Sequence, residues 1–328
     1  MIVKRLIAGI VTLVAVGAAL LFGALRYEEK EFSAPGPANI ETIVTIAPGA
    51  SLQRIATQLE NAGIVEDAFL FRIGVMRREA ATELKAGEYR FPANASMARV
   101  MEMLRNHEAL QHRITLAEGL TANMAVTLVQ NDPILVGQLE EIPPEGSLLP
   151  ETYLFERGTT RQQMIERMRR AQEDLLAELW PMRDPELPID TVQDAIILAS
   201  IVEKETSLAS ERPRIASVFA NRLRMGMRLE SDPTVIYGLT GGEPLGRGLR
   251  VSELETPNPY STYQIDRLPP TPICNPGREA IAAVLNPPDS DDLYFVADGS
   301  GGHAFARSYN EHLRNVAALR RIERDRSR

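Results

Sequence analysis

The sequence predicts an α+β protein with a single amino-terminal transmembrane helix, a small α/β module and a larger, helix-rich α+β domain. Three observations indicate this architecture: a long apolar run near the start, a repeated strand–turn–helix pattern, and a series of capped helices interrupted by prolines. The chain has 328 residues, 44% of them hydrophobic and 24% charged. These values fit two or three globular domains and exclude a disordered or collagen-like chain.

The first element is an apolar helix over residues 6–25, which contain no charged side chain. Twenty residues at about 1.5 Å each span the hydrocarbon core of a bilayer. Lys4 and Arg5 precede the run, so residues 1–5 are expected to form a cytoplasmic tail, with the rest of the protein outside the plasma (inner) membrane. The alternative is a cleaved signal peptide, whose apolar region is shorter, about 7–15 residues, and ends at a small-residue cleavage site.

Charge and cysteine content exclude several classes of function. The net charge of −8 argues against a nucleic-acid partner, because such proteins carry a basic footprint. Cys274 is the single cysteine, which excludes an internal disulfide and a cysteine zinc cluster, and we expect it to be a small buried side chain. No metal and no cofactor are expected, since the four histidines lack metal-ligand spacing with carboxylates. They are His107, His112, His303 and His312.

A Pro/Gly-containing linker is expected over residues 26–40, followed by an internal repeat. Residues 44–59 alternate apolar side chains, turn at a glycine, and switch to helical spacing after a serine, and residues 89–104 repeat this pattern. A weaker third copy starts at Ile114. The first copy resembles a LysM-type glycan-binding module, so residues 41–113 are predicted to form a LysM-like module. The alternative is a purely structural spacer or a partner surface.

The segment best suited to chemistry is a predicted helix over residues 190–207. Asp190 can cap it, with Gln193 completing a capping box, and the apolar residues that follow indicate a buried helix. Glu203 and Glu205 lie at its carboxyl end, where partial desolvation would raise a carboxyl pKa and suit a general acid. The alternative for either glutamate is a solvated helix end or an ion pair with an arginine.

Helical spacing distinguishes the two glutamates only in part. Glu203 shares a face with the small residues Ala199 and Ser200, which leave room for a ligand, whereas Glu205 shares one with bulkier side chains. Further on, Asp232 is expected to cap a short helix rather than to act as a second catalytic carboxylate. Residues 294–296 and 303–305 are predicted to pair as a β-hairpin.

Several strings in the second half of the chain closely resemble the YceG-like endolytic murein transglycosylases. The most specific is Leu-Ala-Ser-Ile-Val-Glu-Lys-Glu-Thr at 198–206, and Ser-Asp-Pro-Thr-Val-Ile-Tyr-Gly at 231–238 also matches. The resemblance continues through Asn-Pro-Gly at 275–277, Tyr-Phe-Val-Ala-Asp-Gly at 294–299 and Gly-His-x-Phe at 302–305. It extends over nearly the whole chain.

The resemblance implies an enzyme that cuts glycan strands internally. Residues 114–328 would form the catalytic domain and cleave the MurNAc-β-1,4-GlcNAc bond without water, leaving a 1,6-anhydro-MurNAc end. The substrate would be nascent strands, whose elongation the cut would terminate. The family's catalytic glutamate falls on Glu203 by direct match of the string. Tyr237, Asn275 and His303 are the candidate glycan-contacting residues.

The partners expected from this resemblance are peptidoglycan glycan strands and the plasma membrane, with peptidoglycan synthases as further candidates. Two other functions remain open. One is hydrolysis of the same bond, with Asp232 or another carboxylate activating water. The other is a non-catalytic scaffold that binds wall glycan or synthesis enzymes through its repeats.

Overall fold

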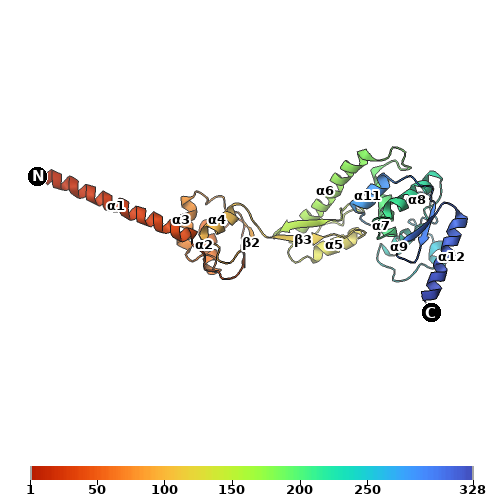
Figure 1. Cartoon of the computed structure of the whole chain (residues 1–328), viewed down its shortest axis with the longest axis horizontal. Coiled ribbons are helices and arrows are strands. Elements are labelled where there is room, and N and C mark those ends of the chain that lie inside the picture. Colours follow the sequence, from red (N-terminus) through yellow and green to blue (C-terminus); the bar gives the residue numbers. More distant parts are fainter. Residues whose placement is uncertain (1, 327–328) are drawn as a thin grey trace. The chain divides into compact units, whose positions relative to one another are not determined.

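The computed structural model describes residues 2–326 and divides the chain into two compact units (Figure 1). Unit 1 is the chain up to His112 together with Leu154–Arg157, and unit 2 is Arg113–Tyr153 together with Gly158–Arg328. Met1 of the expected cytoplasmic tail and the last two residues of the expected catalytic domain lie outside the described residues. The mixture of helices and short two-stranded sheets agrees with the predicted α+β class.

Unit 1 combines a long amino-terminal helix with a small sheet and three shorter helices. Its strands β1 and β2 pair antiparallel, with Thr42 opposite Phe91 and Ile46 opposite Gly87. A core of buried side chains fills the space between this sheet and the helices. The elements are α1 (Ile2–Ser33), β1 (Thr42–Ile46), α2 (Leu52–Asn61), α3 (Ala68–Arg77), β2 (Gly87–Phe91) and α4 (Met97–Arg105).

The predicted strand–turn–helix pattern is confirmed in both copies. Gly49 and Asn94 take positive φ angles of 72° and 55° at the turns after β1 and β2. Ser51 and Ser96 then cap α2 and α4, each accepting a hydrogen bond from the backbone N–H three residues on. The two copies therefore use the same turn and cap chemistry.

Helix α1 continues beyond the apolar run, so the expected linker starts later than predicted. Phe32 is 1% exposed and stacks on Phe71 of α3, with ring centroids 6.2 Å apart. Glu28 is buried and pairs with Arg78 at 2.8 Å. Glu28 and Phe32 are four residues apart and share one helix face, so the helical conformation of residues 26–33 lets both side chains pack against α3 at Gly74.

Among the described residues, Ile7–Ser33 is the one helical segment long and apolar enough to cross a membrane. None of its most apolar stretch is buried within the protein. The apolar side chains before Leu25 whose exposure the structure describes are all exposed, in contrast to the buried Phe32 farther along the same helix.

Phe32→Ala is expected to weaken unit 1, because deleting a buried Phe side chain costs about 3–5 kcal/mol. Hydrogen–deuterium exchange of the α3 amides measures this locally, and they should exchange about 10²–10⁴ times faster than in the wild type. The exposed neighbour Ser33→Ala serves as the control and should leave exchange unchanged. Unchanged exchange in Phe32→Ala would show that residues 26–33 are a loose linker after all.

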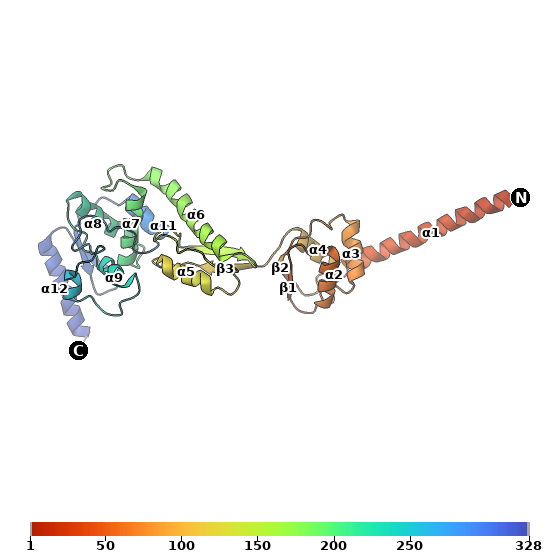
Figure 2. The same ribbon diagram turned by 180° about the vertical axis from the view of Figure 1, so that it is seen from behind.

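Unit 2 is dominated by helices (Figure 2). Strands β3 (Gln111–Thr115) and β4 (Thr152–Glu156) form a two-stranded sheet, and the division between the units falls inside these strands. The third repeat copy is β3 followed by α5, which Thr121 caps. The helices are α5 (Ala122–Asn131), α6 (Arg161–Leu179), the 3₁₀ turn Trp180–Met182, α7 (Val192–Glu205), α8 (Arg212–Arg224), α9 (Asp232–Thr240), α10 (Val251–Glu255), α11 (Arg278–Leu285) and α12 (Tyr309–Arg326).

Helix α7 runs through the core of unit 2 and packs against α8 and α11. Its cap differs by one residue from the predicted one. Thr191, not Asp190, is the N-cap, and its hydroxyl accepts from the Asp194 N–H while the Asp194 carboxylate accepts from the Thr191 N–H. This closed capping box satisfies both backbone donors and fixes where the helix begins. Cys274 is fully buried, as predicted.

Two further predictions concern the segments that border the site. The β-hairpin is confirmed: β5 (Tyr294–Ala297) pairs antiparallel with β6 (His303–Ala306). The cap of α9 is Ser231, not Asp232 as predicted, and its hydroxyl makes no capping hydrogen bond. The Ser231 hydroxyl instead donates to Glu205, which leaves Asp232 as the first helical residue.

Candidate active site

The two glutamates at the end of α7 lie in different surroundings. Two positions along a helix correspond to a rotation of about 200°, so Glu203 and Glu205 point to different sides. Glu203 has a side chain only 4% exposed. Glu205 is partly buried, and it ends the helix. Their hydrogen bonds show what each carboxylate can do.

Both oxygens of Glu203 are occupied by protein donors. Oε1 accepts from the Arg212 guanidinium at 3.1 Å, and Oε2 accepts from the Gly277 N–H at 3.0 Å. Burial raises the pKa of Glu203, while the Gly277 hydrogen bond and Arg212 act in the opposite direction. Glu203 therefore ties α7 to α8 and to the loop before α11.

Arg212 binds two further carboxylates besides Glu203. It reaches Glu118 at 2.8 Å and Glu279 at 2.7 Å, and its own side chain is 8% exposed. A buried guanidinium needs such partners, because an unpaired buried charge costs several kcal/mol. The arrangement is the ion pair with an arginine that the sequence left open as the alternative for Glu203.

Glu205 has no ion pair among the described residues. Its Oε1 accepts a hydrogen bond from the Ser231 hydroxyl, the only described residue that hydrogen-bonds its carboxylate. Burial raises the pKa of Glu205 to about 7, and the nearby charge of Asp232 adds to the rise. A carboxyl group of this kind is half protonated near neutrality, so it can both give and take a proton.

Glu205 also lines two clefts in unit 2. The first has a volume of about 340 Å³, the second about 420 Å³, and Glu203 lines only the second. The first is lined by Glu205, Arg222, Leu229, Glu230, Asp232, Tyr263, Phe295, Val296, Ala297, His303 and His312. The second is lined by Glu118, Gly119, Glu203, Lys204, Glu205, Thr206, Ser207 and Arg212. Glu205 is thus the one residue that these two linings share.

Asp232 and Tyr263 face the first cleft as a hydrogen-bonded pair. The Tyr263 hydroxyl donates to Asp232 Oδ1 at 2.7 Å. This bond fixes the Asp232 carboxylate on the first turn of α9, where the helix dipole favours a negative charge. Burial and the hydrogen bond to Asp232 raise the pKa of Tyr263, so the phenol stays protonated.

His303 lines the same cleft from the hairpin. Its Nδ1 hydrogen-bonds Glu211 at 2.7 Å, and its backbone N–H donates to the other Glu211 oxygen at 2.8 Å. The ring packs edge-on against Phe295, with centroids 5.4 Å apart. Two contacts to one carboxylate hold the imidazole in place, and no described residue hydrogen-bonds its Nε2.

A comparison with known protein families decides where this fold and site belong. The model of the YceG-like family matches residues 44–318, which cover both the repeats and the site. The chain belongs to the YceG-like family.

Curated relatives of this YceG-like chain carry the name endolytic murein transglycosylase. The protein of Streptococcus pneumoniae serotype 2 is 28% identical over 334 residues, covering 86% of this chain and 59% of the relative. This chain thus spans less than two thirds of that protein's length. The Bacillus subtilis protein is 27% identical over 328 residues, covering 90% and 89%. A solved YceG-like protein from Listeria monocytogenes is 28% identical, covers 84% and 98%, and has a TM-score of 0.49.

Of the three predicted glycan contacts in this YceG-like protein, His303 lies with Glu205 and the other two do not line its clefts. Asn275 is fully buried, its Oδ1 accepts from the Leu148 N–H, and its Nδ2 donates to the Leu120 carbonyl. Both ends of this amide thus hold loops together. Tyr237 donates to Glu145 at 3.1 Å and packs against a neighbouring tyrosine ring.

Sequence reasoning missed three residues that lie around Glu205. Ser231, Asp232 and Tyr263 follow it by 26 to 58 positions, and nothing in their spacing shows that they meet at the end of α7 in this YceG-like fold. The sequence predicts Asp232 as the N-cap of this helix, with Pro233 at the first helical position. The signal that could have helped is that Ser231 and Asp232 both suit an N-cap, so one of them is free for other contacts.

Proposed function

We propose that this protein is an endolytic murein transglycosylase and that Glu205 is its proton donor. The observation that carries the proposal is the position of Glu205. It has a pKa of about 7, makes no ion pair among the described residues, and lines two clefts. Glycan extending on both sides of this carboxyl group would allow a cut within a strand. The names of the relatives support the reaction class. Glu203, the residue that the family string assigns, remains the competing candidate.

One carboxyl group is enough for the proposed chemistry. Protonated Glu205 donates its proton to the glycosidic oxygen, and the bond from that oxygen to C1 of the muramic acid breaks through an oxocarbenium-like state. The Glu205 carboxylate then takes the proton of the muramyl 6-hydroxyl as that oxygen bonds to C1. The products are a 1,6-anhydro end and a free hydroxyl on the neighbouring glucosamine. Glu205 ends protonated, and no water is consumed.

Asp232 gives the second candidate reaction, hydrolysis. Its carboxylate lines the cleft beside Glu205 and is fixed by Tyr263, so it could activate a water molecule for attack on C1. In the transglycosylase reaction the same charge would instead stabilise the oxocarbenium-like state. The two reactions differ in their product, which makes them easy to separate.

Digestion of isolated peptidoglycan is expected to yield fragments that end in 1,6-anhydro-muramic acid. Mass spectrometry distinguishes this product, because hydrolysis adds one water to each new end. The same digest run in water enriched in oxygen-18 should leave the new ends unlabelled. Ends that are heavier by one labelled water would contradict the transglycosylase proposal and favour hydrolysis. No cleavage at all would favour the non-catalytic scaffold.

The rest of the chain indicates where the proposed reaction would take place. Within the proposal, α1 anchors the protein in the plasma membrane with its amino end in the cytoplasm, because Lys4 and Arg5 precede the apolar run. The two units would then face peptidoglycan outside the membrane. We propose that unit 1 is a LysM-like module that contacts glycan, and that the cut ends the elongation of nascent strands made by peptidoglycan synthases.

A further inference from the structure

Helix α3 lies at the edge of unit 1 from which α1 projects, and it crosses α1 instead of running along it (Figures 1 and 2). Its buried side faces the core of unit 1 through Phe71 and Val75. A helix in this place is the element of unit 1 nearest to a membrane in which α1 is embedded.

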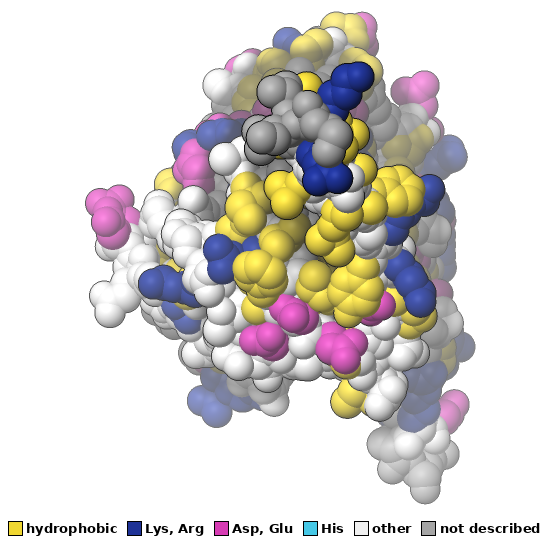
Figure 3. Space-filling view, turned by 90° about the vertical axis from the view of Figure 1, so that its left-hand side faces the viewer, with side chains coloured by type: hydrophobic (Ala, Val, Ile, Leu, Met, Phe, Trp, Pro, Cys, Tyr) yellow, Lys and Arg dark blue, Asp and Glu magenta, His cyan; other side chains and the backbone are white. Residues whose placement is uncertain are grey.

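The outer face of α3 is apolar and has no protein partner among the described residues. Phe69 is 63% exposed and Met76 is 49% exposed, and Ile73 lies partly exposed between them. These positions follow the spacing i, i+4, i+7, so they form one stripe along the helix. Seen from the side on which α1 begins, hydrophobic side chains gather at the centre of the face, with Lys and Arg above and beside them and Asp and Glu below (Figure 3).

Contacts between α3 and α1 fix the height of this stripe along α1. The Arg77 guanidinium donates to the carbonyl of Leu25, the last residue of the apolar run, at 3.4 Å. Arg77 and Arg78 also pair with Glu28 and Glu29. The carboxyl end of α3 therefore stands level with the end of the apolar run. That level is the headgroup layer, which is about 5–7 Å thick on each side of a bilayer.

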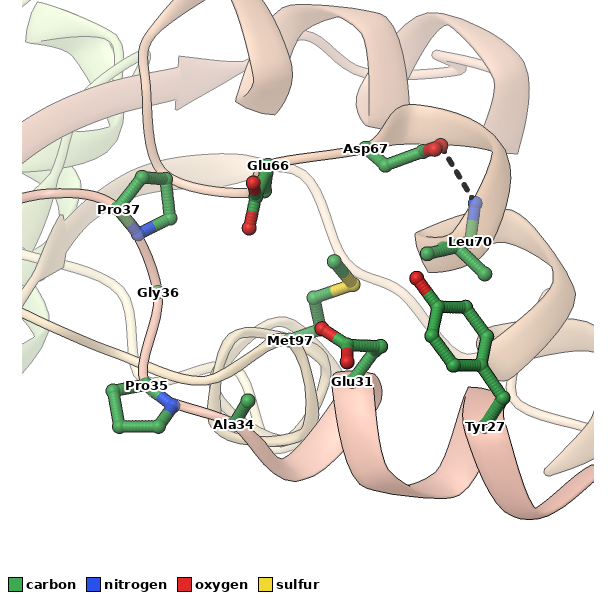
Figure 4. Close-up of a pocket in the computed structure, with 10 residues that line it drawn as sticks. All are labelled: Tyr27, Glu31, Ala34, Pro35, Gly36, Pro37, Glu66, Asp67, Leu70 and Met97. Carbon is green, nitrogen blue, oxygen red and sulfur yellow. Dashed lines mark hydrogen bonds between the residues drawn. The ribbon is translucent and has the colours of Figure 1, made fainter.

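The carboxyl-terminal part of α1 lines a cavity together with other residues of unit 1. Tyr27 and Glu31 project from α1 into a cavity of about 310 Å³, with Glu66 on its opposite side and Met97 within it (Figure 4). Tyr27 is placed where tyrosines collect at membrane interfaces, about 3 Å beyond Leu25 at 1.5 Å per residue. Because α1 is packed into unit 1 here, the depth of α1 in a bilayer sets the depth of α3.

We propose that α3 is an interfacial helix that lies on the lipid surface, with the stripe of Phe69, Ile73 and Met76 inserted between the headgroups. The inference rests on the proposed anchoring by α1. It adds a second lipid contact to the one that α1 makes, and the two together hold unit 1 against the membrane. Interfacial helices insert an apolar face in this way, and Arg72 beside the stripe suits the phosphate layer.

Site-directed spin labelling of the full-length protein tests the proposal in nanodiscs of phosphatidylethanolamine and phosphatidylglycerol. Cys274→Ala removes the native thiol, and single labels are placed by Phe69→Cys and Met76→Cys. Ile43→Cys is the matched control: this β1 residue is 50% exposed, and β1 lies on the edge of unit 1 away from α1 (Figure 2). Val14→Cys within the apolar run reports whether α1 is embedded.

The readout is the ratio of collisions with oxygen, which concentrates in lipid, to collisions with a water-soluble nickel chelate. Labels at positions 69 and 76 should show a ratio at least about threefold above that at position 43, with the highest ratio at position 14. A low ratio at 69 and 76 with a high one at 14 would overturn the docking and leave the anchor intact. A low ratio at 14 would overturn the anchor, and the docking with it.

Discussion

Glu205→Gln is expected to slow glycan cleavage by about a thousandfold, within the range of about 10²–10⁴ that a general acid contributes. Glutamine keeps the size of the side chain and can still accept from the Ser231 hydroxyl, so the clefts should remain. It cannot donate a proton of suitable acidity to the glycosidic oxygen. The measurement is the initial rate of anhydro-end formation on isolated glycan strands, with strand binding measured separately and expected to persist.

Glu203→Gln is the matched control, because it makes the same chemical change two positions away on the same helix. It removes one charged partner of Arg212, which keeps Glu118 and Glu279. We expect a stability loss of about 1–3 kcal/mol, since a hydrogen bond to a charged group is lost, and cleavage within about tenfold of the wild type. The reverse pattern, with Glu203→Gln inactive and Glu205→Gln active, would restore the assignment that the sequence string suggests.

The second large effect concerns stability and its dependence on pH. The pKa of Glu205 rises on folding from an ordinary value of 4.5 to about 7, so the folded protein binds a proton that the unfolded chain releases. A raised pKa contributes its full stability below pH 4.5, and that contribution is lost as the pH rises to about 7. The loss approaches about 3 kcal/mol, at 1.36 kcal/mol per pH unit over this interval.

Glu205→Gln removes this loss, so the variant should be more stable than the wild type at pH 8, by up to about 3 kcal/mol. The difference should shrink as the pH falls and vanish near pH 4.5. Chemical denaturation at a series of pH values, followed through Trp180 of unit 2, measures it. A variant that is equally destabilised at both ends of the range would show that Glu205 is an ordinary structural residue. Replacing an active-site group commonly stabilises a protein at the cost of its activity.

Much of the fold could be predicted from the sequence, because it depends on residues that are close together in the chain. The serine caps after β1 and β2, the β5–β6 hairpin and the apolar helix α7 all follow from patterns within about fifteen residues. The extension of α1 was missed for a physical reason. Glu28 reads as a solvated charge in a polar stretch, and only its pairing with Arg77 and Arg78 makes it a buried residue.

The candidate site also depends on contacts between residues that are far apart in the sequence, which local patterns do not predict. The sequence correctly predicted that desolvated carboxyl groups would stand at the end of α7, and the pKa of both glutamates is raised. It could not show which of them is committed to a structural role. That depends on Arg212 from α8 and on the Gly277 N–H, 74 positions away along the chain. The small side chains on its helix face favoured Glu203 as the proton donor. The contacts that Glu203 makes with distant residues favour Glu205 in that role.

The central claim is that the desolvated Glu205 carboxyl donates the proton, and the pH dependence of kcat/KM on glycan strands tests it most directly. The wild type should lose activity above about pH 7, tenfold per pH unit, because kcat/KM follows the protonated fraction of the free enzyme. Asp232→Asn removes a nearby negative charge and should move this limb to lower pH. Ser231→Ala removes a donor to the carboxylate and should move it to higher pH. A limb that is absent, or that neither substitution moves, would contradict the assignment of Glu205.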